Sequence, residues 1–232
     1  MKKLYPYADC LVALCGLGGA LLRQQMLSGG VDEKGLYPAS AAWSALLVLT
    51  ALVLVGIWLL SHKNVPQPKR PAAFQAVGAL CAAAGLLHFG ISQLSSTLPA
   101  MKIAAILALG GGVSMAVFAV FLLLGKKGWS LTHLIPCVVF ALLLFLEALD
   151  ASREAEFSRY ILQLLAFAAA AVSFFWQLGF DVGSRNGKKA QFWRLAALYL
   201  CLIAAPGSYA LLFTATALYQ LLGCRVSGET AL

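Results

Sequence analysis

The sequence predicts an all-α integral membrane protein, a bundle of about seven transmembrane helices, and two observations carry this prediction. Apolar residues make up 61% of the 232 residues, and charged residues only 11%. A soluble domain is nearer half apolar and about a quarter charged, so this chain has too few charged side chains to cover a surface in water. The length fits one polytopic domain over residues 1–232 rather than several domains.

The spans follow from cutting the chain where charges, prolines and glycines cluster, because a spanning helix needs about 20 mostly apolar residues. The seven predicted spans are residues 7–26, 40–60, 74–93, 101–125, 131–149, 157–180 and 192–222. The last is overlong and carries Pro206, Gly207 and Ser208 at its middle. Proline lacks a backbone donor and kinks helices, and each half is too short to cross alone. One kinked or tilted helix is therefore predicted, with a helix broken at Pro206 as the alternative.

Lysine and arginine set the predicted orientation, because short loops rich in them stay in the cytoplasm. Eleven of the 17 basic residues fall on one side: Lys2, Lys3, Lys63, Lys69, Arg70, Lys126, Lys127, Arg185, Lys188, Lys189 and Arg194. This places the N-terminus inside and the C-terminus outside, in a bacterial-type inner (cell) membrane.

The first apolar run is expected to remain as a span rather than be cleaved as a signal peptide. The net charge of +8 then indicates contact with a lipid bilayer and not with nucleic acid.

Polar side chains near the outer ends of the spans are the candidate functional residues, because such groups are costly at membrane depth. Glu147 and Asp150 are three residues apart, so both can lie on one face of a helix. Arg23 in the first span could pair with one of them near His88. The candidate outer polar cluster comprises Arg23, His88, Gln93, Glu147, Asp150 and Gln220. In the competing interpretation, these groups reach the lipid headgroups and only lock helices together.

No pattern in the sequence indicates a catalytic site, a metal site or a cofactor. It has neither an HExxH motif nor two histidines four residues apart. His88 and His133 fall near opposite ends of their predicted spans, which disfavours a haem, and no lysine lies in the last span to hold retinal. The six cysteines form no CxxC pair. An enzyme is therefore the least favoured class.

Small residues recur in several spans and predict close helix packing there. They include Gly16, Gly18 and Gly19, then Gly78 and Gly85, and Gly110 to Gly112. The first three and last three spans share an orientation, so an internal repeat is also left open.

Two functions from different classes fit these features. The leading hypothesis is a small-molecule transporter, or the membrane subunit of one, in which the outer polar cluster binds the solute. The alternative is a non-transporting membrane module, a sensor or an assembly subunit, that acts through a partner membrane protein or as an oligomer.

Overall fold

The computed structural model describes residues 7–28, 41–62, 71–125, 130–152, 157–181 and 187–223, and every regular element within these ranges is helical. This confirms the predicted all-α class. The helices are α1 (Ala8–Ser28), α2 (Ala41–His62), α3 (Ala72–Gln93), α4 (Pro99–Leu123), α5 (Leu134–Ala151), α6 (Phe157–Asp181), α7 (Gly187–Ala204) and α8 (Ala210–Leu222). A short 3-10 helix, η2 (Ser130–His133), leads into α5. Each of the first six predicted spans corresponds to one helix.

Five helical segments are long and apolar enough to cross a membrane: Ala8–Ser28, Trp43–Ser61, Ala72–Gln93, Pro99–Leu123 and Tyr160–Gly179. Their number, length and composition indicate a multi-pass membrane protein. The helices α5 and α7 have 18 residues each and α8 has 13. At 1.5 Å per residue, α8 is about 20 Å long, which is shorter than the hydrocarbon core of about 30 Å. Length alone therefore does not fix the number of spans at seven.

Apolar side chains form stripes on the outside of the bundle. On α1, Leu14, Leu17 and Leu21 are each more than half exposed and share one helix face, and Ile103 and Ile106 repeat the pattern on α4. Soluble monomers rarely expose large continuous apolar patches. A lipid surrounding accounts for these stripes, as the composition predicted.

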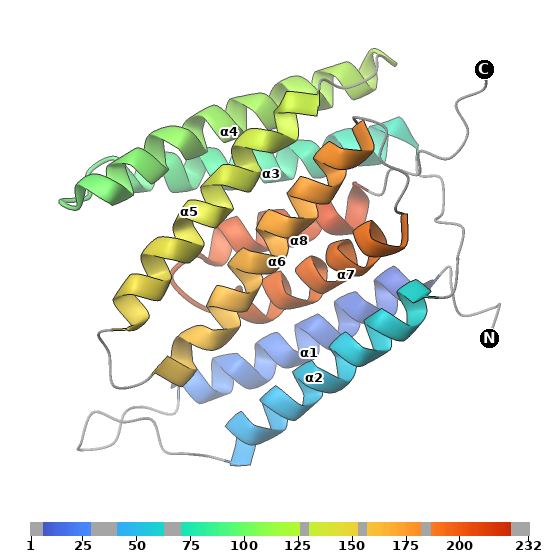
Figure 1. Cartoon of the computed structure of the whole chain (residues 1–232), viewed down its shortest axis with the longest axis vertical. Helices are drawn as coiled ribbons and strands as arrows, with labels where there is room; N and C mark the ends of the chain where they lie inside the picture. The colour runs from blue at the N-terminus through green and yellow to red at the C-terminus, as the bar shows by residue number, and fades with distance from the viewer. Residues whose placement is uncertain are drawn as a thin grey trace.

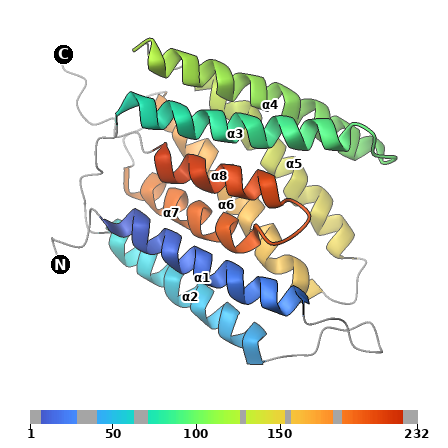
Figure 2. The same ribbon diagram turned by 180° about the vertical axis from the view of Figure 1, so that it is seen from behind.

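The helices form two layers with the α7–α8 pair at the centre. Seen from behind, α4, α3, α8, α7, α1 and α2 lie side by side in that order (Figure 2), and α5 and α6 cross the opposite face (Figure 1). The helix α7 packs against α1, α2, α6 and α8, whereas α8 packs against α3. Every side chain from Arg194 to Cys201 is buried, so α7 is the most enclosed part of the bundle.

The segment predicted as one long span is two helices, so the kinked-helix prediction is wrong and the alternative of a break at Pro206 is correct. The helix α7 ends at Ala204 and α8 begins at Ala210. Pro206 has no N–H to continue the helical hydrogen bonds, and its ring crowds the preceding turn. Arg194 near the start of α7 donates a hydrogen bond to the carbonyl of Gln220 near the end of α8. The two helices therefore run antiparallel.

This hairpin brings the end of α8 back to the end of the bundle where α1 begins (Figures 1 and 2). The prediction that the chain starts and finishes on opposite sides is therefore not met by α1 and α8. We name this end the basic end, because Lys188, Lys189 and Arg194 lie in the first turns of α7 there. The opposite end, with Glu147 and Asp150 in the last turns of α5, is the acidic end.

Glycines allow the closest approaches between helices. A Cβ built on Gly85 of α3 would lie 2.5 Å from Ala215 Cβ of α8, and one on Gly112 of α4 would lie 2.5 Å from Leu87 Cγ of α3. These glycines are needed at their positions, as the sequence predicted. Gly110 has no neighbour within 4 Å at its Cβ position. Similar close approaches occur at Gly16, Gly19 and Gly90, whereas Gly18, like Gly110, faces open space.

Candidate functional site

A cavity of about 420 Å³ lies at the acidic end, between α1, α5, α6 and the turn that joins α7 to α8. Three members of the predicted polar cluster line it, namely Arg23, Glu147 and Asp150. The other lining residues are Leu27, Tyr160, Gln163, Pro206, Gly207, Ser208 and Tyr209. The proline that ends α7 therefore also forms part of the cavity wall.

Glu147 is held from two sides by neutral donors. Gln163 Nε2 of α6 donates a hydrogen bond of 2.9 Å to Glu147 Oε2, and the Tyr209 hydroxyl donates to Glu147 Oε1. Gln163 and Tyr209 are each 8% exposed. A half-buried carboxylate is costly unless it is hydrogen-bonded, and these two bonds fix its position.

Tyr209 owes its position to aromatic packing next to the turn. Its ring lies 5.2 Å from that of Phe167 on α6 and 5.7 Å from that of Phe89 on α3, between centroids. Both are edge-on or tilted arrangements, which aromatic pairs prefer. The hydroxyl of a ring packed in this way is directed at Glu147, so the turn after α7 positions the carboxylate of α5.

Arg23 supports the other side of the cavity. The side chain is 4% exposed, and its Nη1 donates a hydrogen bond of 3.1 Å to the carbonyl of Ile203 in the last turn of α7. The last four carbonyls of a helix lack partners within the helix, and a cation there also interacts favourably with the helix dipole. Arg23 therefore both caps α7 and contributes a positive charge to the cavity.

The structure does not bring His88, Gln93 and Gln220 of the predicted cluster into this cavity. His88 is exposed on α3, because the neighbouring Gly85 and Phe89 turn toward the bundle and position 88 turns away. Gln93 lies at the end of α3 and is not among the lining residues. Gln220 is fully buried near the basic end, because the break at Pro206 reverses the direction of the chain.

Gln163 and Tyr209 contact Glu147 although neither belongs to the predicted cluster. Each is a polar residue in or beside an apolar run, which is the signal that could have identified it. Their partnership with Glu147 depends on how α6 and the turn fold against α5.

A second polar network occupies the bundle interior toward the basic end. Gln220 Oε1 accepts hydrogen bonds from Ser173 Oγ (3.0 Å) and Gln177 Nε2 (3.2 Å). The Tyr219 hydroxyl donates to Gln177 Oε1 and lies 2.8 Å from His133 Nε2. This network joins η2, α6 and α8. Such buried polar groups stabilise a bundle when they are bonded to one another.

A buried ion pair adjoins this network. Arg194 Nη2 lies 2.5 Å from Asp9 Oδ1, and both side chains are less than 10% exposed. Arg194 Nη1 also donates a hydrogen bond of 2.8 Å to the carbonyl of Gln220. One guanidinium therefore connects the start of α1 to the end of α8, at the basic end of α7.

No protein-family model, curated protein or solved structure matches this chain. Within the described ranges, no three histidine, cysteine, aspartate or glutamate side chains gather as a metal-binding group. Among the described residues, one guanidinium and two carboxylates line the cavity, and their chemistry is the guide to function.

Proposed function

We propose that this chain is a multi-pass membrane protein that binds a small positively charged solute in the acidic-end cavity and carries it across the membrane, alone or as the membrane subunit of a transporter. The observation that carries the proposal is the convergence of Arg23, Glu147 and Asp150 on a cavity beside the turn of the central α7–α8 hairpin.

The break between α7 and α8 supports transport over a purely structural role. Irregular backbone at membrane depth is tolerated where it lines a cavity. Here the turn at Pro206 and Gly207 borders the cavity, and the two helices that it joins lie at the centre of the bundle. A change in how this hairpin packs would alter the cavity directly.

The charges of the lining favour a cation. Two carboxylates, Glu147 and Asp150, against the single guanidinium of Arg23 leave a formal charge of −1 among the described lining side chains. Arg23 is already bonded to the Ile203 carbonyl, whereas Asp150 is exposed at the mouth of the cavity. An ammonium group would be attracted to the carboxylates more strongly here than in bulk water, because the site is partly desolvated.

The proposal is tested by comparing two probes of the same size and opposite charge, propylammonium and propionate. Purified protein in lipid nanodiscs should bind propylammonium and not propionate, as measured by calorimetry. Glu147→Gln should abolish the binding, and Asp150→Asn should weaken it. His88→Gln on the exposed face of α3 is the control and should leave it unchanged. Equal binding of the two probes, or no binding of either, would contradict the proposal.

Uptake separates the transporter from a non-transporting module. Proteoliposomes containing the wild-type protein should accumulate radiolabelled propylammonium faster than those containing Glu147→Gln. If propylammonium binds but uptake equals that of empty liposomes, the cavity is a sensing site and the non-transporting module is the correct class.

A further inference from the structure

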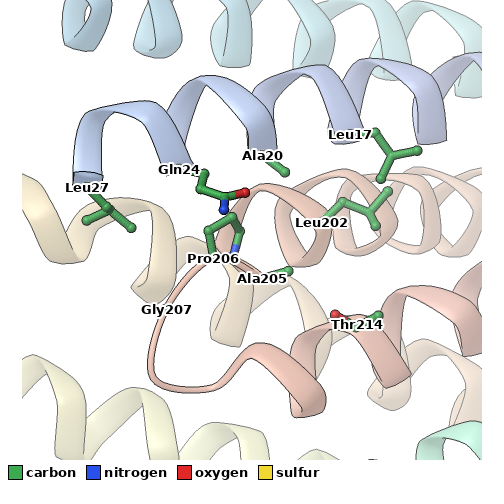
Figure 3. A pocket seen from close by; sticks show the side chains of 9 residues that line it. All are labelled: Leu17, Ala20, Gln24, Leu27, Leu202, Ala205, Pro206, Gly207 and Thr214. Atoms are coloured by element: carbon green, nitrogen blue, oxygen red, sulfur yellow. The ribbon is translucent and has the colours of Figure 1, made fainter. Parts of the chain in front are cut away.

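A groove of about 510 Å³ runs between α1 and the α7–α8 hairpin, next to the cavity. Leu17, Ala20, Leu202 and Ala205 give it mostly apolar walls. Figure 3 shows the side chains of α1 facing those of α7 and the turn across this groove, with Thr214 of α8 on the far wall. The groove also reaches Gln24, Leu27, Pro206 and Gly207.

The groove and the cavity are neighbouring parts of one surface depression. Leu27, Pro206 and Gly207 line both of them. At its other end the groove reaches Leu17, which is 51% exposed and belongs to the lipid-facing stripe of α1. A path therefore leads from the lipid-facing surface, along apolar walls, to a cavity that carries two carboxylates.

We propose that the solute of the cavity is an amphiphilic amine from the bilayer, with its ammonium group at Glu147 and Asp150 and its alkyl chain in the groove between α1 and the α7–α8 hairpin. This inference rests on the proposed function, because it assumes that the cavity binds a cation. The apolar surface next to the site indicates that this cation carries an alkyl chain.

The length of the groove suits an alkyl chain of medium length. Leu17 and Leu27 are separated by about 15 Å along the axis of α1, at about 1.5 Å per residue. An extended alkyl chain of about ten to twelve carbons spans such a distance. Relative to water, burial of each methylene is worth about 0.8 kcal/mol, or about fourfold in affinity. A chain that enters from the bilayer is already out of water, so its gain over lipid comes from van der Waals packing against the groove walls.

The test is the chain-length dependence of binding in the wild type and in variants with a filled groove. Propylammonium, hexylammonium and decylammonium are titrated into nanodiscs that contain the wild type, Ala20→Phe or Thr214→Phe. The two variants fill the groove from opposite walls, so the test survives if one of them fails to fold. Leu14→Phe is the matched control, because Leu14 lies on the lipid-facing side of α1 and does not line the groove.

In a filled groove, the ratio of variant Kd to wild-type Kd should stay near one for propylammonium and rise at least tenfold for decylammonium. The control should give a ratio near one at every length, which removes the effect of simple partition into lipid. If the groove variants also give a ratio near one at every length while propylammonium binds, the inference is wrong and the proposed function stands. If the wild type does not bind propylammonium, both are overturned.

Covalent labelling is a second, independent way to locate the alkyl chain of the bound amine. A decylammonium analogue with a photoreactive diazirine at the chain end should label Leu17, Leu202 or Thr214, with the labelled residue assigned by fragmentation of the peptides. Labelling confined to outward-facing positions such as Leu14 or Ile103, at the level seen with a neutral decyl diazirine, would contradict binding in the groove.

Discussion

Arg23, near the end of α1, donates a hydrogen bond of 3.1 Å to the backbone carbonyl of Ile203 in the last turn of α7. Arg194 makes the corresponding bond to the carbonyl of Gln220 at the end of α8. Each helix of the central hairpin therefore finishes against a buried arginine from another helix. Both arginines supply donors to carbonyls that a helix end leaves unpaired. Arg23 in this way fixes the part of the cavity wall that the turn after α7 forms.

Removing the hydrogen bond between Arg23 and the Ile203 carbonyl should destabilise the α7–α8 hairpin. We expect Arg23→Gln to lower the free energy of unfolding by about 1.5–3 kcal/mol, the range for a hydrogen bond to a charged group. The thermal transition of the purified protein in detergent should fall accordingly. Gln25→Ala, an exposed position two residues along α1, is the control and should change the transition little. Equal transitions for the two variants would show that the bond contributes nothing.

Replacing both partners of the buried ion pair between Asp9 and Arg194 should cost less than the sum of the two single replacements. Asp9→Asn leaves a buried guanidinium without its charged partner, which typically costs about 3–5 kcal/mol. The double variant Asp9→Asn/Arg194→Gln removes both charges, so its loss should be smaller than the sum of the two single losses. The measurement is a double-mutant cycle of thermal or denaturant unfolding in detergent. Strict additivity would argue against the pairing.

Two glycine substitutions should have opposite effects. A Cβ at Gly85 would lie 2.5 Å from Ala215 Cβ, so Gly85→Ala should force α3 and α8 apart and cost about 1–3 kcal/mol. Gly110 has no neighbour within 4 Å at its Cβ position. Gly110→Ala should therefore be neutral or stabilise α4 by about 0.5–1 kcal/mol, because alanine is the better helix residue. Thermal unfolding of both variants in one detergent tests the contrast, which disappears if Gly85 is not a helix contact.

The hairpin also makes a prediction about membrane topology. Tags fused to the two ends of the chain should be accessible from the same side of the membrane, and the excess of lysine and arginine near the basic end predicts the cytoplasmic side. A tag inserted in the turn between α3 and α4, at residues 94–98, should be accessible from the opposite side. Protease protection in membrane vesicles measures all three. A C-terminal tag on the side opposite to the N-terminal tag would contradict the antiparallel arrangement of α7 and α8.

The helices themselves were largely predictable, and the directions in which their side chains face were not. In water, one polar face marks the outside of a helix. In lipid, both the outside and the packed inside are apolar, so the sequence around His88 does not reveal that Phe89 is buried and His88 exposed. For the same reason, Glu147 was a predictable candidate, whereas its bonds to Gln163 and Tyr209 required the arrangement of α5, α6 and the turn.

The sequence by itself determined the helical membrane class, the first six helices and the position of Arg23, Glu147 and Asp150 near one end of the bundle. These features follow from local quantities, namely the transfer of apolar side chains out of water and the pairing of backbone groups within each helix. Only the tertiary structure decided that Pro206 ends a helix and reverses the chain, and hence that Gln220 lies far from the cavity. The residues of α8 are apolar enough to continue a kinked helix or to fold back, and their packing against α3 and α7 selects the hairpin.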